Sequence, residues 1–284
     1  MIKRAAKNFC FCPLFSGSSG NAAYIGFGDD GLLIDCGKSG RTIETSLEAI
    51  GVEMRSIRGI FLTHAHADHV CGAGVLARRY KIPIFATRGT WSDIIERGGL
   101  GRIDETRVSL FDSAQKTVDT RLGELDGCGA LEGITIETFP LPHDAREPVG
   151  YRFTCGSHRA VIATDIGYVT PELKAAAHGA EVILLESNHD LDMLKNGSYP
   201  WVLKRRILSN HGHLSNDAAG IFAAELVQNG TRRIYLGHLS HENNRPMLAF
   251  STVAERLAAE RIDPRKDVEL IVAERDAPSP SFEC

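Results

Sequence analysis

The sequence lacks any apolar run that approaches the roughly 18 residues needed to cross a membrane. Its first segment is basic, but Asn8 and Pro13 interrupt a short apolar stretch that has no clear small-residue cleavage site, so we expect no signal peptide. The 7 cysteines are an odd and scattered set, unlike the even framework that cross-links small secreted folds. These absences predict a soluble protein of the reducing cytoplasm.

Neither sign of charge dominates the chain. Lys and Arg together number 32, Asp and Glu 36, and the net charge of −4 provides no global field toward nucleic acid or anionic membranes. Any contact with nucleic acid must therefore depend on local patches. Internal repeats and low-complexity segments are also absent, and 43% hydrophobic with 24% charged residues excludes disordered and collagen-like chains.

Short apolar runs alternate with stretches of helical period, which is typical of layered α/β folds. We expect strands over residues 22–27, 32–34, 59–62, 82–86, 134–139, 151–155, 160–163, 182–185, 234–236 and 268–272. Helices are predicted over 41–50, from a Ser215 cap to Gly230, and from Pro246 to about Ile262. The 284 residues are interpreted as a single domain, with 88–130 as a polar excursion or lid and 276–284 as a loose tail.

Ionisable residues gather where the apolar runs end. Six runs stop in His or Asp, namely at Asp35, the cluster from His64 to His69, His143, Asp165, His189 and His238. Ligands of layered α/β folds lie beyond the carboxyl ends of the strands. The six segments are therefore predicted to converge on one cleft.

The densest signal is the run His64-Ala65-His66-Ala67-Asp68-His69, which places four potential metal ligands in six residues. Alternate residues of an extended loop project to the same side, so His64 and His66 can hold one ion while Asp68 and His69 face a second. Imidazole and carboxylate suit Zn²⁺, Mn²⁺ or Fe²⁺. A solvated polar loop is the competing interpretation, but adjacent desolvated imidazoles would repel each other once protonated, and a metal removes that repulsion.

The run T-H-A-H-A-D-H resembles the HxHxDH motif of the metallo-β-lactamase-fold metallohydrolases. Asp35, His143 after Pro142, Asp165 in ATD and His238 in LGH match that family's other motifs in order, and the resemblance covers roughly residues 12–273. It implies an α/β fold of the four-layer αββα type, with the metal site at one edge between two sheets.

The same resemblance implies a ligand set and roles for its members. By the family pattern, one ion would be bound by His64, His66 and His143, a second by Asp68, His69 and His238, with Asp165 as the bridge. Asp35 would lie behind these ligands and orient a histidine by a hydrogen bond. Asp165 and His66 also distinguish the chain from β-lactamases, which have Cys at the first position, and from di-iron oxygen reductases, which have Glu at the second. Both point to a hydrolase of esters or phosphodiesters.

Five further segments resemble the YycJ or WalJ branch of this family, which is described as bacterial DNA 5′→3′ exonucleases. They are SGSSGN at 16–21, ESNHD at 186–190, YPWVLKRRILS at 199–209, GHLSN at 212–216 and LGHLSHENN at 237–244. His241 departs from the acidic residue that is commoner at its place in the branch. The roles of His211 and His241 are left open.

Substrate contacts are expected from a loop and from a basic cluster. The loop residues Ser16, Ser18, Ser19 and Asn21 offer polar groups that can cradle a phosphate, although a tight turn between strands explains the same pattern. The cluster is Lys204, Arg205 and Arg206, which either lines a groove for a nucleic-acid backbone or marks a solvated helix face.

Two further histidines are assigned to catalysis together with Asp68 and Asp165. His213 and His189 can hydrogen-bond a phosphate, and His213 can protonate a leaving oxygen, since imidazole titrates near neutral pH. A hydrogen-bonded structural histidine is the alternative for both. Cys10 and Cys12 are expected to be buried small hydrophobes, because their C-x-C spacing has no second pair.

Together these patterns predict a phosphodiester hydrolase with two divalent ions per chain, of zinc, manganese or iron. We expect a 5′→3′ exonuclease on single-stranded DNA or RNA, or at a frayed 5′ end, and no membrane partner. The alternatives are a small-molecule cyclic phosphodiesterase, a thioester hydrolase, and a metal-binding regulatory module with vestigial turnover. The intact ligand set argues against the last of these.

Overall fold

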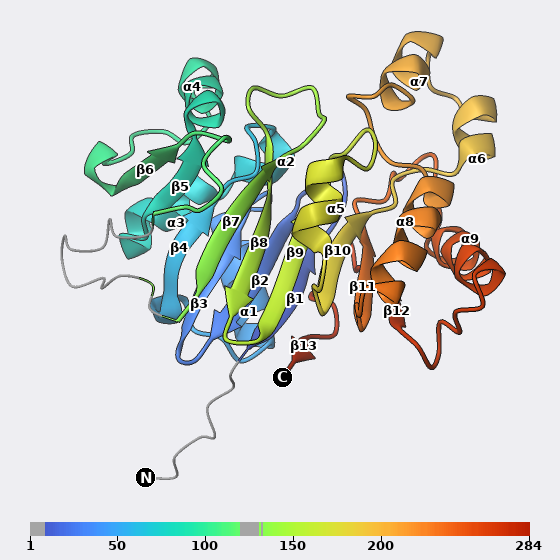
Figure 1. Ribbon diagram of the computed structural model, residues 1–284. Coiled ribbons are helices and arrows are strands. Elements are labelled where there is room, and N and C mark those ends of the chain that lie inside the picture. Colours follow the sequence, from blue (N-terminus) through green and yellow to red (C-terminus); the bar gives the residue numbers. More distant parts are fainter. Residues whose placement is uncertain (1–8, 120–130, 132) are drawn as a thin grey trace.

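The fold is built on two mixed β-sheets, and the computed structural model describes residues 9–119, 131 and 133–284 (Figure 1). The first sheet has the strand order β13-β1-β2-β3-β4-β5-β6 and the second β12-β11-β10-β9-β8-β7. The strands of the first sheet are β1 (Cys10–Phe15), β2 (Ala22–Phe27), β3 (Asp30–Ile34), β4 (Ile57–Phe61), β5 (Ile84–Thr87), β6 (Val108–Phe111) and β13 (Phe282–Glu283). Those of the second are β7 (Thr135–Pro140), β8 (Val149–Cys155), β9 (His158–Ala163), β10 (Val182–Glu186), β11 (Arg233–Gly237) and β12 (Glu269–Val272).

Helices cover the outer face of each sheet. Those of the first half are α1 (Gly40–Ala49), α2 (Ala67–Val70), α3 (Ala73–Tyr80) and α4 (Arg88–Arg97), with short 3-10 turns at Met54–Ser56 and Glu105–Arg107. Those of the second half are α5 (Pro171–Ala177), α6 (Leu191–Asn196), α7 (Trp201–Ile207), α8 (Asn216–Gln228) and α9 (Pro246–Ala259). In Figure 1, α6 and α7 stand beyond the end of the second sheet, above α8. No helix in the described part of the chain has the length and apolarity to cross a bilayer.

Three apolar cores separate four layers of secondary structure. One core lies between the two sheets, and each of the other two lies between a sheet and its helices. Strand β10 shows the alternation, since Val182 and Leu184 face the other sheet while Ile183 and Leu185 face the helices. A strand covered on both faces is apolar throughout, which is why such strands are legible as continuous hydrophobic runs. The expected four-layer αββα sandwich is confirmed.

The sheet topology brings the ends of several strands to one edge. Strand β3 pairs in parallel with β4, and β10 pairs in parallel with both β9 and β11. Their carboxyl ends therefore point the same way within each sheet, and the loops that follow them carry Asp35, His64, Asp165 and His238. The predicted convergence of these segments follows from the topology.

The predicted strands are all present, within a few residues of their expected ends. The N-terminal caps of α1 and α8 are Ser39 and Ser215, and Pro246 opens α9 as expected. Cys10 and Cys12 are buried in the core beneath the helices of the first sheet, as predicted. Strands β1, β6 and β13 were not expected, and Pro13 lies inside β1.

Regular structure occupies much of the segment expected to be an excursion or lid. Within residues 88–119, helix α4 begins at a Thr87 cap and ends at Gly98, and β6 extends the first sheet beside β5. A Thr cap and a left-handed Gly supply the ends that this ten-residue helix needs. Residues 120–130 lie outside the described residues, and the lid remains an untested prediction.

The segment 276–284 is packed and not loose. Strand β13 pairs with β1 in an antiparallel register, with Phe282 opposite Phe11. Phe282 is 5% exposed in the core between the sheets, and the guanidinium of Arg233 lies 5.3 Å from its ring centroid. One buried aromatic residue anchors a segment whose Pro and Ser content suggested disorder.

We expect Phe282→Ala to lower the free energy of unfolding by about 3 kcal/mol, because it removes a buried aromatic side chain and leaves a cavity. Denaturant unfolding followed by circular dichroism measures the change. Trp201→Ala is the matched control, since that ring is 62% exposed and its removal should cost less than about 0.5 kcal/mol. Equal stability of both variants would contradict the anchoring of β13.

Candidate metal centre

The loop after β4 presents the histidine cluster. The chain leaves the strand at Phe61, and His66 is the last extended residue before α2 begins at Ala67. His64 and His69 are fully buried, while His66 and Asp68 are partly exposed. The loop therefore places two of its potential ligands inside the edge of the sandwich and two at its mouth.

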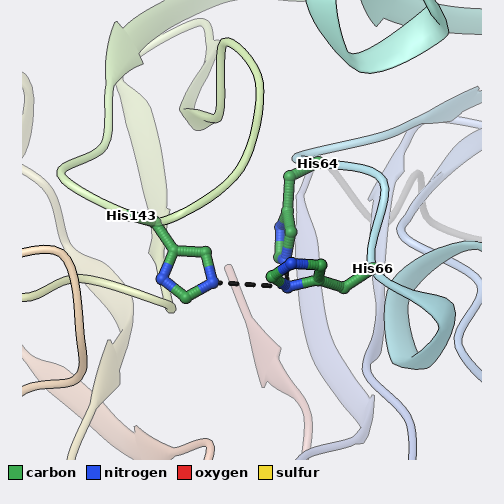
Figure 2. Close-up of side chains that lie close together, drawn as sticks. All are labelled: His64, His66 and His143. Atoms are coloured by element: carbon green, nitrogen blue, oxygen red, sulfur yellow. Dashed lines mark hydrogen bonds between the residues drawn. The ribbon is translucent and has the colours of Figure 1, made fainter. Parts of the chain in front are cut away.

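Three imidazoles converge at the site (Figure 2). His64 and His66 come from this loop, and His143 comes from the loop after β7. The Nδ1 atom of His66 lies 3.0 Å from Nε2 of His64 and 3.4 Å from Nε2 of His143. Burial, together with the charge of the neighbouring imidazoles, lowers the pKa of all three rings. Three uncharged rings with nitrogens turned toward one point provide lone pairs for a cation.

A second cluster joins Asp68, His69 and His238. The Oδ2 atom of Asp68 lies 3.7 Å from Nε2 of His69 and 3.8 Å from Nε2 of His238. One atom from each of the three residues falls within 4.8 Å of the others. The structure thus brings together both triplets of residues that the family pattern implies.

Asp165 lies between the two clusters. Its Oδ2 is 3.2 Å from Nε2 of His69, and its Oδ1 is 3.5 Å from Nδ1 of His238 and 3.8 Å from Nε2 of His143. The carboxylate therefore reaches both clusters at once. This is the placement that a bridging ligand needs.

Asp35 lies behind His69. Its Oδ2 is 2.8 Å from Nδ1 of His69 and accepts a hydrogen bond from the hydroxyl of Thr63, while its Oδ1 accepts one from the backbone N–H of Thr63. Because Nδ1 faces the carboxylate of Asp35, it carries a proton, and Nε2 is the ring nitrogen that faces Asp68 and Asp165.

Left-handed backbone directs three of these side chains into the site. Asp35, Asp165 and His238 follow strands β3, β9 and β11, and their φ angles are 58°, 59° and 55°. This conformation is uncommon for residues other than glycine. Each strand therefore ends in a sharp change of direction at a residue of the site.

Glu186, the last residue of β10, is a member of the site that the sequence analysis missed. Its Oε1 accepts 2.8 Å hydrogen bonds from Nδ1 of both His213 and His238, and its Oε2 accepts from the backbone N–H groups of Ile166 and Leu214. Burial alone would raise the pKa of Glu186, but the two imidazoles lower it to about 2. The sequence does contain a signal for it, because Glu186 ends a wholly apolar strand. Asp35 and Asp165 likewise lie just after the ends of apolar strands.

The other four histidines considered in the sequence analysis are of two kinds, largely buried near the site or exposed. His213 lies between the clusters, with its ring centroid 5.3 Å from that of His143 and 5.2 Å from that of His238. His189 is 1% exposed, burial lowers its pKa to about 4, and neither ring nitrogen has a hydrogen-bond partner in the described part of the chain. His211 and His241 are exposed, and His241 pairs with its neighbour Glu242.

The loop at 16–21 contributes to the site differently from what was expected. Ser16 is buried, and its hydroxyl accepts a hydrogen bond from the backbone N–H of His238. Asn21 is also buried, and its amide nitrogen lies 3.0 Å from Nε2 of His69. The polar groups of Ser16 and Asn21 therefore help to hold the site together, and their contact with substrate stays a prediction. Ser18 and Ser19 are exposed.

A close approach of backbone explains one glycine beside this loop. A Cβ atom at Gly37 would lie 1.7 Å from the carbonyl oxygen of Asp68 and 2.5 Å from the backbone nitrogen of Asn21. Any larger residue would separate the loop at 16–21 from the metal loop.

The three residues of the basic cluster on α7 have different surroundings. Lys204 is buried, and its ammonium group donates to the carbonyl oxygens of Lys195 and Gly197 at the end of α6. Lys204 therefore joins α7 to the end of α6, and its contact with substrate stays a prediction. Arg206 forms a 2.6 Å ion pair with Asp144, next to His143, and Arg205 is exposed.

The donor set fits divalent cations. Burial opposes protonation of His238, yet the carboxylates of Asp165, Asp68 and Glu186 raise its pKa to about 10, which shows the excess of negative charge. Asp165 Oδ2 and His238 Nε2 are buried without a hydrogen bond in the described part of the chain. Unpaired buried polar atoms are costly, and metal ions that take the place of the His238 proton and are coordinated by imidazole and carboxylate would satisfy them.

Comparisons with known proteins agree with this geometry. A family model described as "Beta-lactamase superfamily domain" matches residues 31–239. The chain is 37% identical to exodeoxyribonuclease YycJ of Bacillus anthracis, over 87% of this chain and 88% of that protein. It is 38% identical to exodeoxyribonuclease WalJ of Streptococcus pneumoniae, over 88% of each.

Solved structures show the same fold at low sequence identity. The metallo-β-lactamase fold protein YhfI from Bacillus subtilis superposes with a TM-score of 0.69 at 18% identity, covering 97% of this chain and 99% of that one. The short form of human tRNase Z gives a TM-score of 0.61 at 18% identity, over 95% of this chain and 98% of that one. The chain therefore belongs to the metallo-β-lactamase superfamily, in the branch that contains YycJ and WalJ.

Proposed function

We propose that this chain hydrolyses phosphodiester bonds of nucleic acid with two divalent metal ions and acts as a 5′→3′ exonuclease on single-stranded ends. The observation that carries the proposal is the pair of ligand clusters joined by Asp165. One ion would be held by His64, His66 and His143, and the other by Asp68, His69 and His238. The exodeoxyribonuclease names of the relatives at 37% and 38% identity support the choice of substrate.

Two ions in such an arrangement lower the pKa of a water molecule and offset negative charge on the phosphoryl oxygens. The residues of the chain supply the remaining functions. Glu186 accepts from Nδ1 of His213, which leaves Nε2 as the ring nitrogen that faces substrate. From that position, a protonated His213 can donate to the leaving oxygen. Burial lowers the pKa of His213, but Glu186 raises it above the ordinary value, which favours the protonated form.

Helix α7 offers two accessible cationic side chains to a substrate. Arg205 is exposed on α7, and Arg206, although paired with Asp144, is 55% exposed. Few phosphates can then be neutralised, which suits the end of a strand better than a long duplex.

We expect the protein saturated with Zn²⁺ or Mn²⁺ to hold close to two ions per chain. Asp165→Ala should impair both sites together, because its carboxylate reaches both clusters. Elemental analysis after gel filtration measures the ratio, and Asp192→Ala, on the exposed side of α6, is the control. One ion or fewer in the unaltered protein contradicts a dinuclear site, and loss of a single ion in Asp165→Ala contradicts bridging.

Asp35→Asn should weaken metal binding by about 10- to 100-fold while the fold is retained, because His69 Nδ1 loses a charged acceptor. Competition with a chromogenic chelator measures affinity, and thermal unfolding reports the fold. Asp30→Asn changes the same side-chain type at the opposite end of β3 and should bind metal normally. Normal affinity in Asp35→Asn would remove Asp35 from its assigned role.

Digestion of DNA and RNA strands labelled at either end, by the Mn²⁺- and Zn²⁺-loaded protein, tests the activity and its polarity. We expect mononucleotides to be released from the 5′ end of single strands. Arg205→Ala should reduce the slope of log affinity against log salt by about 0.7, the loss of one phosphate contact, whereas exposed Arg41→Ala should leave it unchanged. Efficient hydrolysis of a small diester without cleavage of any labelled strand would identify a small-molecule phosphodiesterase instead.

A further inference from the structure

A pocket of about 380 Å³ adjoins His213, between the segment after β9 and helices α5 and α8. Its volume lies within the range of natural small-ligand sites, roughly 300 to 1,000 Å³. His213 lines this pocket and also lies against His143 and His238 of the metal centre. A group attached to a phosphate at the metal centre can therefore extend directly into the pocket.

The walls of the pocket are apolar and its rim is partly aromatic. Leu214 and Phe222 are 2% and 3% exposed and form part of the core beneath α8. Tyr168 and Ile221 also line the pocket, and they are 45% and 57% exposed. Exposed apolar side chains around a cavity are typical of binding sites, and a tyrosine ring is a surface on which a nucleobase stacks.

His189 supplies a polar group inside these walls. Its ring is buried, and neither nitrogen finds a partner among the described residues, which is costly for a polar group. Its backbone is held by a hydrogen bond from the N–H of Asn216 to its carbonyl, which fixes the point from which the ring projects. A neutral imidazole offers one donor and one acceptor, the combination that also lines the edge of a base.

Charge around the pocket is balanced. Lys174 and Glu225 line its other end and form a 2.6 Å ion pair with each other. This pair offers no net charge to a second phosphate, and the apolar walls favour a neutral, flat and partly polar group.

We propose that this pocket is a nucleoside subsite, which holds the base of the nucleotide attached to the scissile phosphate. The base stacks on Tyr168 and its polar edge meets His189. The inference deepens the proposed function and rests on it for the presence of a phosphate at the metal centre.

Two synthetic diesters with the same leaving group test the subsite, namely thymidine 5′-(4-nitrophenyl phosphate) and methyl 4-nitrophenyl phosphate. With the metal-loaded full chain, we expect kcat/KM to favour the thymidine ester by about five- to a hundredfold, the range of one base stack. Ala218→Leu, which fills the pocket from α8, should bring this ratio close to one. The matched control is Ala258→Leu on the exposed side of α9, which should keep the preference.

Binding of free thymidine, measured by calorimetry on the metal-loaded protein, separates the subsite from catalysis. We expect His189→Leu to weaken it at least about tenfold, since an apolar side chain cannot pair with the base. Hydrolysis of both esters at equal rates, with no thymidine binding, would overturn the subsite and leave the proposed function standing. Thymidine binding that Ala218→Leu abolishes, without hydrolysis of either ester, would support the subsite and contradict the proposed function.

Discussion

The burial of three carboxylates at one edge of the sandwich, beside a partly exposed fourth, is the constraint to which the surrounding structure responds. Asp35, Asp165 and Glu186 are 3%, 3% and 0% exposed, and Asp68 completes the group. Charges in such a place are stable only when they are paired. Each carboxylate accordingly faces an imidazole, as Asp35 faces His69 and Glu186 faces His213 and His238. The carboxylates are thus paired with imidazoles inside the protein, and the opposite side of the network is open to cations.

Glu186 connects the two halves of this network. Through one oxygen it fixes the tautomers of His213 and His238, and through the other it ties the loops after β9 and α7 by their backbone N–H groups. A single carboxylate thereby positions a residue of the metal cluster and a residue that lines the adjoining pocket. Glu186 therefore sets the geometry on both sides of His213, at the metal centre and at the adjoining pocket.

Sequence patterns predict the strands well, and they predict which residues gather at the candidate metal centre, because both depend on local features. A strand buried on two faces is apolar in sequence, and a candidate ligand of this fold closely follows such a strand, as Asp165 does after β9. Contacts across long separations are different. Glu186 acts through residues 27 and 52 positions away, and the pattern VILLE does not reveal them. Ser16, Asn21 and Lys204 are polar residues of the kind that usually face solvent. Their polar atoms instead lie against backbone or site groups of other segments, and only the fold determines those partners.

The left-handed turns at Asp35, Asp165 and His238 limit what substitution can achieve at these positions. Asp, Asn and His tolerate this conformation better than other residues with a Cβ atom, whereas β-branched side chains do not. The residue types that the backbone accepts here are nearly the same as those that chelate metals. A descendant of this protein that lost its ions would still retain such residues at these three positions for conformational reasons. Their presence in a related sequence is therefore weaker evidence for activity than an intact set at His64, His66 and His143.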